Sequence, residues 1–260
     1  MNKLTNFFKR NMKEVLRDSV IYIFCLVFPL VMLLLFSIIA NYTDGNTPMF
    51  ELSSLLPAII MFSFSFDMIT MALLVSRDRQ TSFLKRLYSS PMKAYHFILG
   101  YALVGFLVGL AQTIICILFS FIISLINGVS FAPFANLLLL VLSQLPILIT
   151  FVFLGILFGT IFNDKSAPGI CSIIISVAGV LGGCWMPLDA MGNFELFCRF
   201  LPFYPSVYIG RITTSAVKAF GGYYTFDTTA LLGLIPIFVF MCLSVILSCV
   251  FFKKQMVNDN

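Results

Sequence analysis

The sequence predicts an all-α, polytopic membrane protein with six transmembrane helices. Its composition, its long apolar runs and the distribution of its basic residues all support this fold class. Hydrophobic residues make up 60% of the 260 positions and charged residues only 10%, whereas about a quarter of a typical soluble domain is charged. The mean hydropathy is +1.03. Because so few charges cannot cover a water-facing surface, we expect most of the chain to lie in a membrane.

Six apolar runs are the predicted spans. About 20 apolar residues cross the hydrocarbon layer, and only helical backbone satisfies its own hydrogen bonds there. The third and fourth runs are longer than this, so we expect them to tilt or to continue past the bilayer, while the fifth is short and rich in glycine. The predicted spans are residues 20–40, 52–75, 97–126, 134–162, 169–185 and 230–252.

The basic residues fix the predicted orientation. Thirteen of the sixteen Lys and Arg residues lie before the first span or after the second, fourth and sixth spans. The other three, Arg199, Arg211 and Lys218, follow the fifth span. By the positive-inside rule both termini are cytoplasmic, and the expected location is a bacterial plasma membrane. This placement accounts for the net charge of +5 without a nucleic-acid partner.

Segments outside the spans give the remaining predicted organisation. Residues 1–19 are expected to form an amphipathic helix at the membrane interface, although a solvated basic tail is the alternative. Residues 20–252 form the membrane domain, and 253–260 a cytoplasmic tail. The segment 186–229 is too apolar for a solvated loop and is broken by prolines. It is predicted to form re-entrant helices on the outer side.

The loop after the second span contains a second short amphipathic helix, at about 80–89. Four of its side chains share an apolar face: Phe83, Leu84, Leu87 and Tyr88. Such a helix, held between two spans, can dock into a groove of a soluble partner. It can equally rest on lipid, and the pattern alone does not separate these two hypotheses.

The second span carries a polar stripe formed by Ser63, Asp67 and Thr70. A carboxylate inside a span costs about 2.5–3.5 kcal/mol on insertion scales, so Asp67 is expected to face the bundle interior. The stripe is a candidate translocation path or proton site, or it makes a hydrogen bond that packs two helices. In the fourth span, Gly155 and Gly159 are expected to allow close helix packing.

The seven cysteines do not form the spacing of a disulfide framework or a zinc site. Cys184 and Cys198 lie near one membrane face and are the one pair that a disulfide could join. No nucleophile with a base, paired acids or metal ligands occurs within the spans. We therefore expect a protein that is not an enzyme and that has no cofactor or metal of its own.

Two landmarks carry a family resemblance. Residues 78–91 read DRQTSFLKRLYSSP and resemble the loop of ABC type-2 (ABC-2) permeases, in which an acidic residue precedes a short turn, a basic-Leu pair and Ser/Thr-Pro. Residues 182–188 (GGCWMPL) and 200–205 (FLPFYP) are similar to that family's exit from the fifth helix and its later Leu-Pro stretch. Span count, orientation and landmark order agree over almost the whole chain.

The resemblance implies that two permease copies pair and bind two ATPase subunits from the cytoplasmic side. The 83–88 helix and the N-terminal helix would be the ATPase contacts. The glycine spacing at residues 100–106 lacks the Lys and Ser/Thr of a nucleotide-binding loop. ATP is therefore expected to be bound by the partner subunit.

Two other function classes compete with an ATP-driven exporter. An ion-coupled secondary transporter often has repeated halves, and no repeat relates residues 20–126 to 134–252. A membrane-embedded enzyme would need a set of catalytic or metal-binding residues, which the spans lack. The apolar outer segment and the few buried charges favour a hydrophobic or amphipathic cargo, such as a drug, an antimicrobial peptide or a lipid-like molecule.

Overall fold

The computed structural model describes residues 3–19, 23–42, 48–81, 93–128 and 132–258. Within these ranges the elements are helices, apart from an isolated antiparallel bridge between Val217 and Tyr223. The elements are α1 (Lys3–Val15), the π-helix η1 (Ile23–Val27), α3 (Phe28–Tyr42), η2 (Pro48–Phe50), α4 (Leu52–Gln80), α6 (Ala94–Asn127), α7 (Phe134–Ile161), α8 (Ala167–Leu181), η3 (Leu188–Ala190), α9 (Asn193–Cys198), α10 (Phe203–Thr213) and α11 (Thr228–Asn258). The predicted all-α class is confirmed.

Five helical stretches in the described residues are long and apolar enough to cross a membrane. Their bounds are Ile23–Tyr42, Leu52–Gln80, Ala94–Asn127, Phe134–Ile161 and Thr228–Met256. The fifth predicted span corresponds to α8, which is apolar but has only 15 residues. Hydropathy thus located each of these five stretches, and α4 and α11 continue beyond the predicted ends of their spans.

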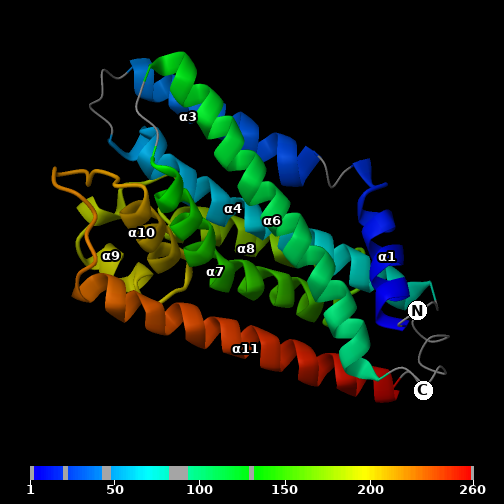
Figure 1. Cartoon of the computed structure of the whole chain (residues 1–260). Coiled ribbons are helices and arrows are strands. Elements are labelled where there is room, and N and C mark those ends of the chain that lie inside the picture. Colours follow the sequence, from blue (N-terminus) through cyan, green and yellow to red (C-terminus); the bar gives the residue numbers. More distant parts are fainter. Residues whose placement is uncertain (1–2, 20–22, 43–47, 82–92, 129–131, 259–260) are drawn as a thin grey trace.

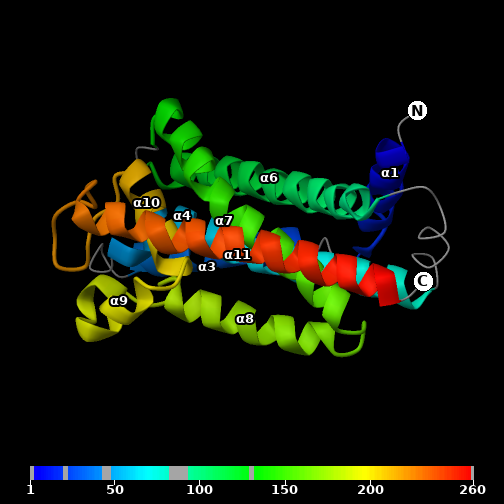
Figure 2. The same cartoon turned by 90° about the horizontal axis from the view of Figure 1, so that it is seen from below.

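The helix α4 lies at the centre of the bundle (Figure 1). It packs against α3, α6, α7, α8 and α10. In the most apolar window of α4, 89% of residues are buried, compared with 22% in the first and last spans. Figure 2 shows α6 and α8 on opposite sides, with α4 and α7 between them. Polar side chains on α4 therefore face protein, whereas α3 and α11 expose most of their apolar surface.

Two glycines on α7 explain how closely it approaches α4. A Cβ atom at Gly155 would lie 2.4 Å from the carbonyl oxygen of Met68, and one at Gly159 would lie 2.5 Å from that of Ala72. No side chain fits at either position unless the backbones separate. The predicted role of these glycines in close packing is confirmed.

The bundle has two distinct ends (Figure 1). The helix α1 and the C-terminal end of α11 lie at one end, which we call the inner end. The short helices α9 and α10 lie at the other, the outer end. The helix α10 is enclosed by α4, α7 and α11, whereas α9 keeps Phe194, Leu196 and Phe197 exposed.

Candidate functional site: the inner end of α4 and a buried polar centre

The N-terminal helix α1 is docked on protein through its apolar stripe. The Phe7 ring contacts the rings of Phe97 and Tyr101 edge-on, with centroids 5.4 and 5.0 Å apart. Gly100 lies directly beneath this ring, because a Cβ atom there would be 2.4 Å from Phe7 Cδ1. The start of α6 is thus shaped to receive Phe7. The apolar stripe of α1 packs largely on protein, while its basic face stays open.

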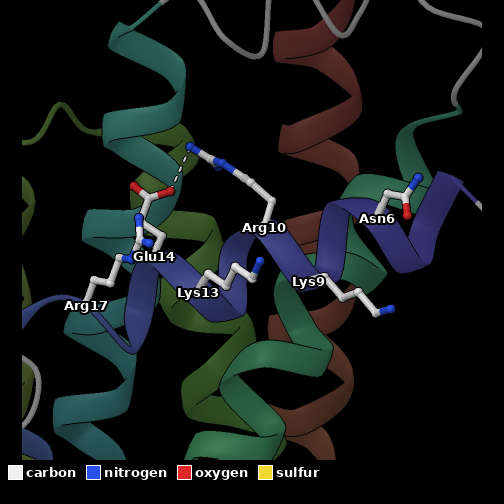
Figure 3. Close-up of a pocket in the computed structure, with 6 residues that line it drawn as sticks. All are labelled: Asn6, Lys9, Arg10, Lys13, Glu14 and Arg17. Carbon is white, nitrogen blue, oxygen red and sulfur yellow. Dashed lines mark ion pairs between the residues drawn. The ribbon is translucent and has the colours of Figure 1, made fainter.

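A buried carboxylate ties α1 to the end of α4. Asp78 is 1% exposed, forms an ion pair with Arg10 and accepts a 2.7 Å hydrogen bond from the Tyr101 hydroxyl. Arg10 also pairs with Glu14 at 2.7 Å, so a single guanidinium serves two carboxylates. Figure 3 shows Arg10 and Glu14 pointing toward each other on the side of α1 that faces α4. We call Arg10, Asp78 and Tyr101 the inner anchor, since it joins α1, α4 and α6.

Further contacts hold the last turn of α4. Arg77 pairs with Asp18 at 2.9 Å, just after α1. Gln80 donates a 2.7 Å hydrogen bond to Asp164, in the turn between α7 and α8. The chain therefore leaves α4 from a fixed position on its way to the loop that the sequence identified.

The predicted coupling helix at about 80–89 begins within the described residues but continues outside them. Its four named side chains, Phe83, Leu84, Leu87 and Tyr88, all lie outside the described residues. Their predicted contact with an ATPase therefore stays a prediction. What the structure describes is the set of contacts that precede this loop.

The polar stripe on α4 contains side chains that have hydrogen-bond partners and one that has none among the described residues. Ser63 donates to the carbonyl oxygen of Ile60 at 2.7 Å, and Thr70 to that of Phe66 at 3.0 Å. Asp67 lies between them, completely buried, and neither carboxylate oxygen has a hydrogen-bond partner among the described residues. Since buried polar groups are normally paired, Asp67 is the residue of the stripe that needs explanation.

A second unsatisfied oxygen lies on the neighbouring α6. Gln112 donates from Nε2 to the carbonyl oxygen of Cys25 at 3.1 Å, while its Oε1 has no partner among the described residues. Cys25 belongs to the π-helix η1, and its Sγ lies 3.3 Å from Thr70 Oγ1. Cys25 therefore links α4 and α6, and π-turns of this kind often occur at functional positions. We call Cys25, Asp67, Thr70 and Gln112 the polar centre.

An open cleft of about 270 Å³ lies between α1 and the polar centre. Its walls come from the end of α1, η1, α4 and the start of α8, and they are mainly apolar. Thr70 belongs both to this lining and to the polar centre. Glu14, Asp18 and Arg77 provide the charged groups in the lining. Burial raises the pKa of Glu14, and repulsion from Asp78 raises it further. We call this space the inner cleft.

At the outer end, the buried residue Arg211 joins three segments that are distant in sequence. Its guanidinium donates to the carbonyl oxygens of Ser54 at 3.2 Å and Gly183 at 3.0 Å, and to the Tyr224 hydroxyl at 3.4 Å. Sequence reasoning treated Arg211 as one of three basic residues in an outer loop and missed this role. Its place in an apolar segment rich in Tyr and Pro was the available signal.

The two cysteines for which a disulfide was considered are free and buried. Cys184 Sγ instead lies 3.3 Å from the carbonyl oxygen of Ala58 on α4. No group of three or more His, Cys, Asp or Glu side chains in the described part of the chain could hold a metal ion.

Comparison with known proteins adds to this geometry. The family model described as "ABC-2 type transporter" matches residues 3–215, a range that contains the inner anchor, the polar centre and Arg211. The Bacillus subtilis (strain 168) protein named "Putative transport permease YvfS" is 23% identical over 212 residues, covering 78% of this chain and 82% of the relative. The chain therefore belongs to the ABC-2 type transporter family.

Proposed function

We propose that this chain is the membrane-spanning subunit of an ATP-driven exporter. Two copies pair, and a separate ATP-binding-cassette ATPase docks at the inner end, so that ATP and its hydrolysis belong to the partner. The cargo is hydrophobic or amphipathic. Family membership and the membrane-length helices support a transport role, and the contacts around α4 support an ATPase-driven one.

The inner anchor is the observation that carries this proposal. A permease that receives work from another subunit needs a rigid element at the point of contact. The last turn of α4 is held through Asp78, Arg77 and Gln80, with partners on α1, just after α1, on α6 and in the turn between α7 and α8. A displacement of the loop that follows α4 would therefore move several helices together.

We infer six passes, with both termini in the cytoplasm. The helix α8 lies along the same direction as the long helices (Figure 2), and its 15 residues are about 22 Å long at 1.5 Å per residue. This is shorter than the hydrocarbon layer of about 30 Å, which thins or deforms around short spans. With six passes, the basic residues of α1 and of the end of α11 share one side, as the positive-inside rule requires.

The segment after α8 supports the inference of re-entrant helices on the outer side. The helix α10 is enclosed among the ends of α4, α7 and α11, which is the setting in which non-spanning backbone is tolerated at membrane depth. At the inner end, we infer that the axis of α1 lies parallel to the cytoplasmic membrane surface, with its basic face open.

Co-expression of this chain with the ATP-binding-cassette ATPases of its host, followed by co-purification, tests the proposal. The double variant Phe83→Asp/Leu87→Asp should lose the ATPase and ATP-dependent transport while still inserting normally, because it removes two apolar anchors and adds two charges at the contact. Burial of each anchor is worth roughly 1.5–3 kcal/mol.

A matched control places the same changes at the opposite end. Phe220 and Tyr223 are exposed, at 83% and 64%, so Phe220→Asp/Tyr223→Asp should retain the ATPase. If the Phe83→Asp/Leu87→Asp protein binds ATPase as well as this control does, the loop is not the coupling element. If the unaltered chain binds no ATPase, the proposed function itself is wrong.

A further inference from the structure

The orphaned oxygens of the polar centre define what could satisfy them. Asp67 Oδ1, Asp67 Oδ2 and Gln112 Oε1 are all hydrogen-bond acceptors, and none has a partner among the described residues. An alcohol could supply one donor, and a fully deprotonated anion such as a sulfate ester could supply none. A protonated amine supplies up to three N–H donors together with a positive charge that would compensate an ionised, buried carboxylate.

The inner cleft is suited to the apolar part of such a molecule. It is lined by six apolar side chains: Val15, Phe24, Ile69, Leu73, Leu74 and Pro168. Phe24 is half exposed and stacks on Phe66, with ring centroids 6.1 Å apart. The cleft is open to the exterior of the bundle near the inner end, where an amphiphile in the inner leaflet would meet it.

The charged side chains that line the cleft are two acids, Glu14 and Asp18, and one base, Arg77. Arg10 is shared between Glu14 and Asp78, so these three groups together carry one net negative charge. Arg77 and Asp18 form a pair with no net charge. Arg10 only partly offsets the repulsion between the carboxylates of Glu14 and Asp78. A cation that approaches Glu14 therefore relieves the rest of this repulsion.

Thr70 connects the cleft to the polar centre. It lines the cleft, contacts Cys25 and lies three residues, or about 4.5 Å of helix rise, from Asp67. We propose that the inner cleft and the polar centre form one site for an amphiphile with a primary or secondary ammonium group. Its N–H donors bind Asp67 and Gln112, and its apolar body fills the cleft. This inference rests on the proposed transport function and names its cargo class.

Photolabelling in lipid nanodiscs tests the site, with the permease alone and with its ATPase. The probe is a dodecylammonium ion that carries a diazirine on its chain, and labelled peptides are mapped by mass spectrometry. We expect saturable labelling of the α4 peptide around Ile69 and Leu73. Dodecylammonium should compete at least about tenfold better than dodecanol or dodecyl sulfate, a factor that corresponds to about one charge-assisted hydrogen bond.

Three variants separate the proposal from simple partitioning into lipid. Asp67→Asn should weaken labelling about tenfold or more, since the amide cannot offer a charge. Leu73→Trp should fill the cleft and remove saturable labelling without touching the polar centre. Glu51→Gln, the same type of change at the outer end of α4, should leave labelling unchanged.

The outcomes distinguish this inference from the proposed function. Equal competition by dodecanol, or unchanged labelling of the Asp67→Asn protein, overturns the ammonium site even when the ATPase complex is intact and active. Loss of the ATPase complex with labelling preserved overturns the exporter proposal and leaves a cation-binding membrane protein.

Discussion

Replacing Asp78 with Asn should release α1 from the bundle. Asp78 accepts a 2.7 Å bond from Tyr101 and pairs with Arg10, and hydrogen bonds to charged groups contribute about 1.5–3 kcal/mol. The Arg10 side chain is 36% exposed and keeps Glu14 as a second partner, so the lower end of this range applies. We expect a loss of about 1.5 kcal/mol of docking free energy, or about a tenfold higher undocked population.

Hydrogen exchange of the backbone amides of α1 measures this population. An isolated helix of 13 residues is marginal in water, so undocking should expose its amides. Exchange of α1 should rise about tenfold in the Asp78→Asn protein, with ATP-coupled transport reduced. In the control Asp164→Asn, which removes the charge of a carboxylate that is bonded to Gln80 rather than to α1, exchange of α1 should not change.

A double-mutant cycle isolates the ion pair from other effects. Arg10→Ala and Asp78→Ala should each raise exchange, and the double variant should raise it by less than the product of the two factors. If Asp78→Asn leaves both α1 exchange and coupled transport at their original values, the inner anchor does not hold α1 and the force-transmission argument fails.

Three further predictions follow from packing, buried charge and topology. Gly155→Ala should lower stability by about 1–3 kcal/mol, seen as a lower midpoint of thermal unfolding, because the new Cβ meets backbone; Gly169→Ala, with open space around it, should not. Arg211→Met should lower the midpoint of thermal unfolding but retain transport per folded molecule, since the guanidinium holds segments together rather than handling cargo; unchanged thermal stability would refute this role. Cysteines introduced at Gly222 should react with impermeant reagents from outside and at Ser89 from inside only, and outside labelling at Ser89 would refute the six-pass topology.

The long helices were predictable because a membrane imposes a simple rule on sequence. A run of about 20 apolar residues has one stable backbone conformation in lipid, so the positions of α3, α4, α6, α7 and α11 follow from hydropathy, although α4 and α11 extend past their predicted ends. The helix α8 is the exception, because its short apolar stretch ends at a pair of glycines and a turn. Its length could be read from the sequence, but not its place beside α4.

The candidate site was predictable only in part. The stripe containing Asp67 was visible from helical spacing, because residues three and four apart share a face. That Asp67 has no hydrogen-bond partner in the described part of the chain was not visible, since this depends on which helices surround α4. The amphipathic character of α1 was visible too, but lipid and the start of α6 are both apolar, so sequence could not choose between them. Arg211 was missed because a basic residue outside a span reads as a topology signal.

The backbone contact between α4 and α7 has a mechanical consequence. Flexible side chains at a helix interface can change rotamer and let one helix slide, but at Gly155 and Gly159 carbonyl groups meet bare Cα atoms. Sliding by even one residue would drive a neighbouring side chain of α7 into the α4 backbone. The two helices therefore behave as one rigid unit across the membrane. A displacement that enters at the end of α4 therefore moves α7 with it, and any opening of the bundle separates the other helices from this pair.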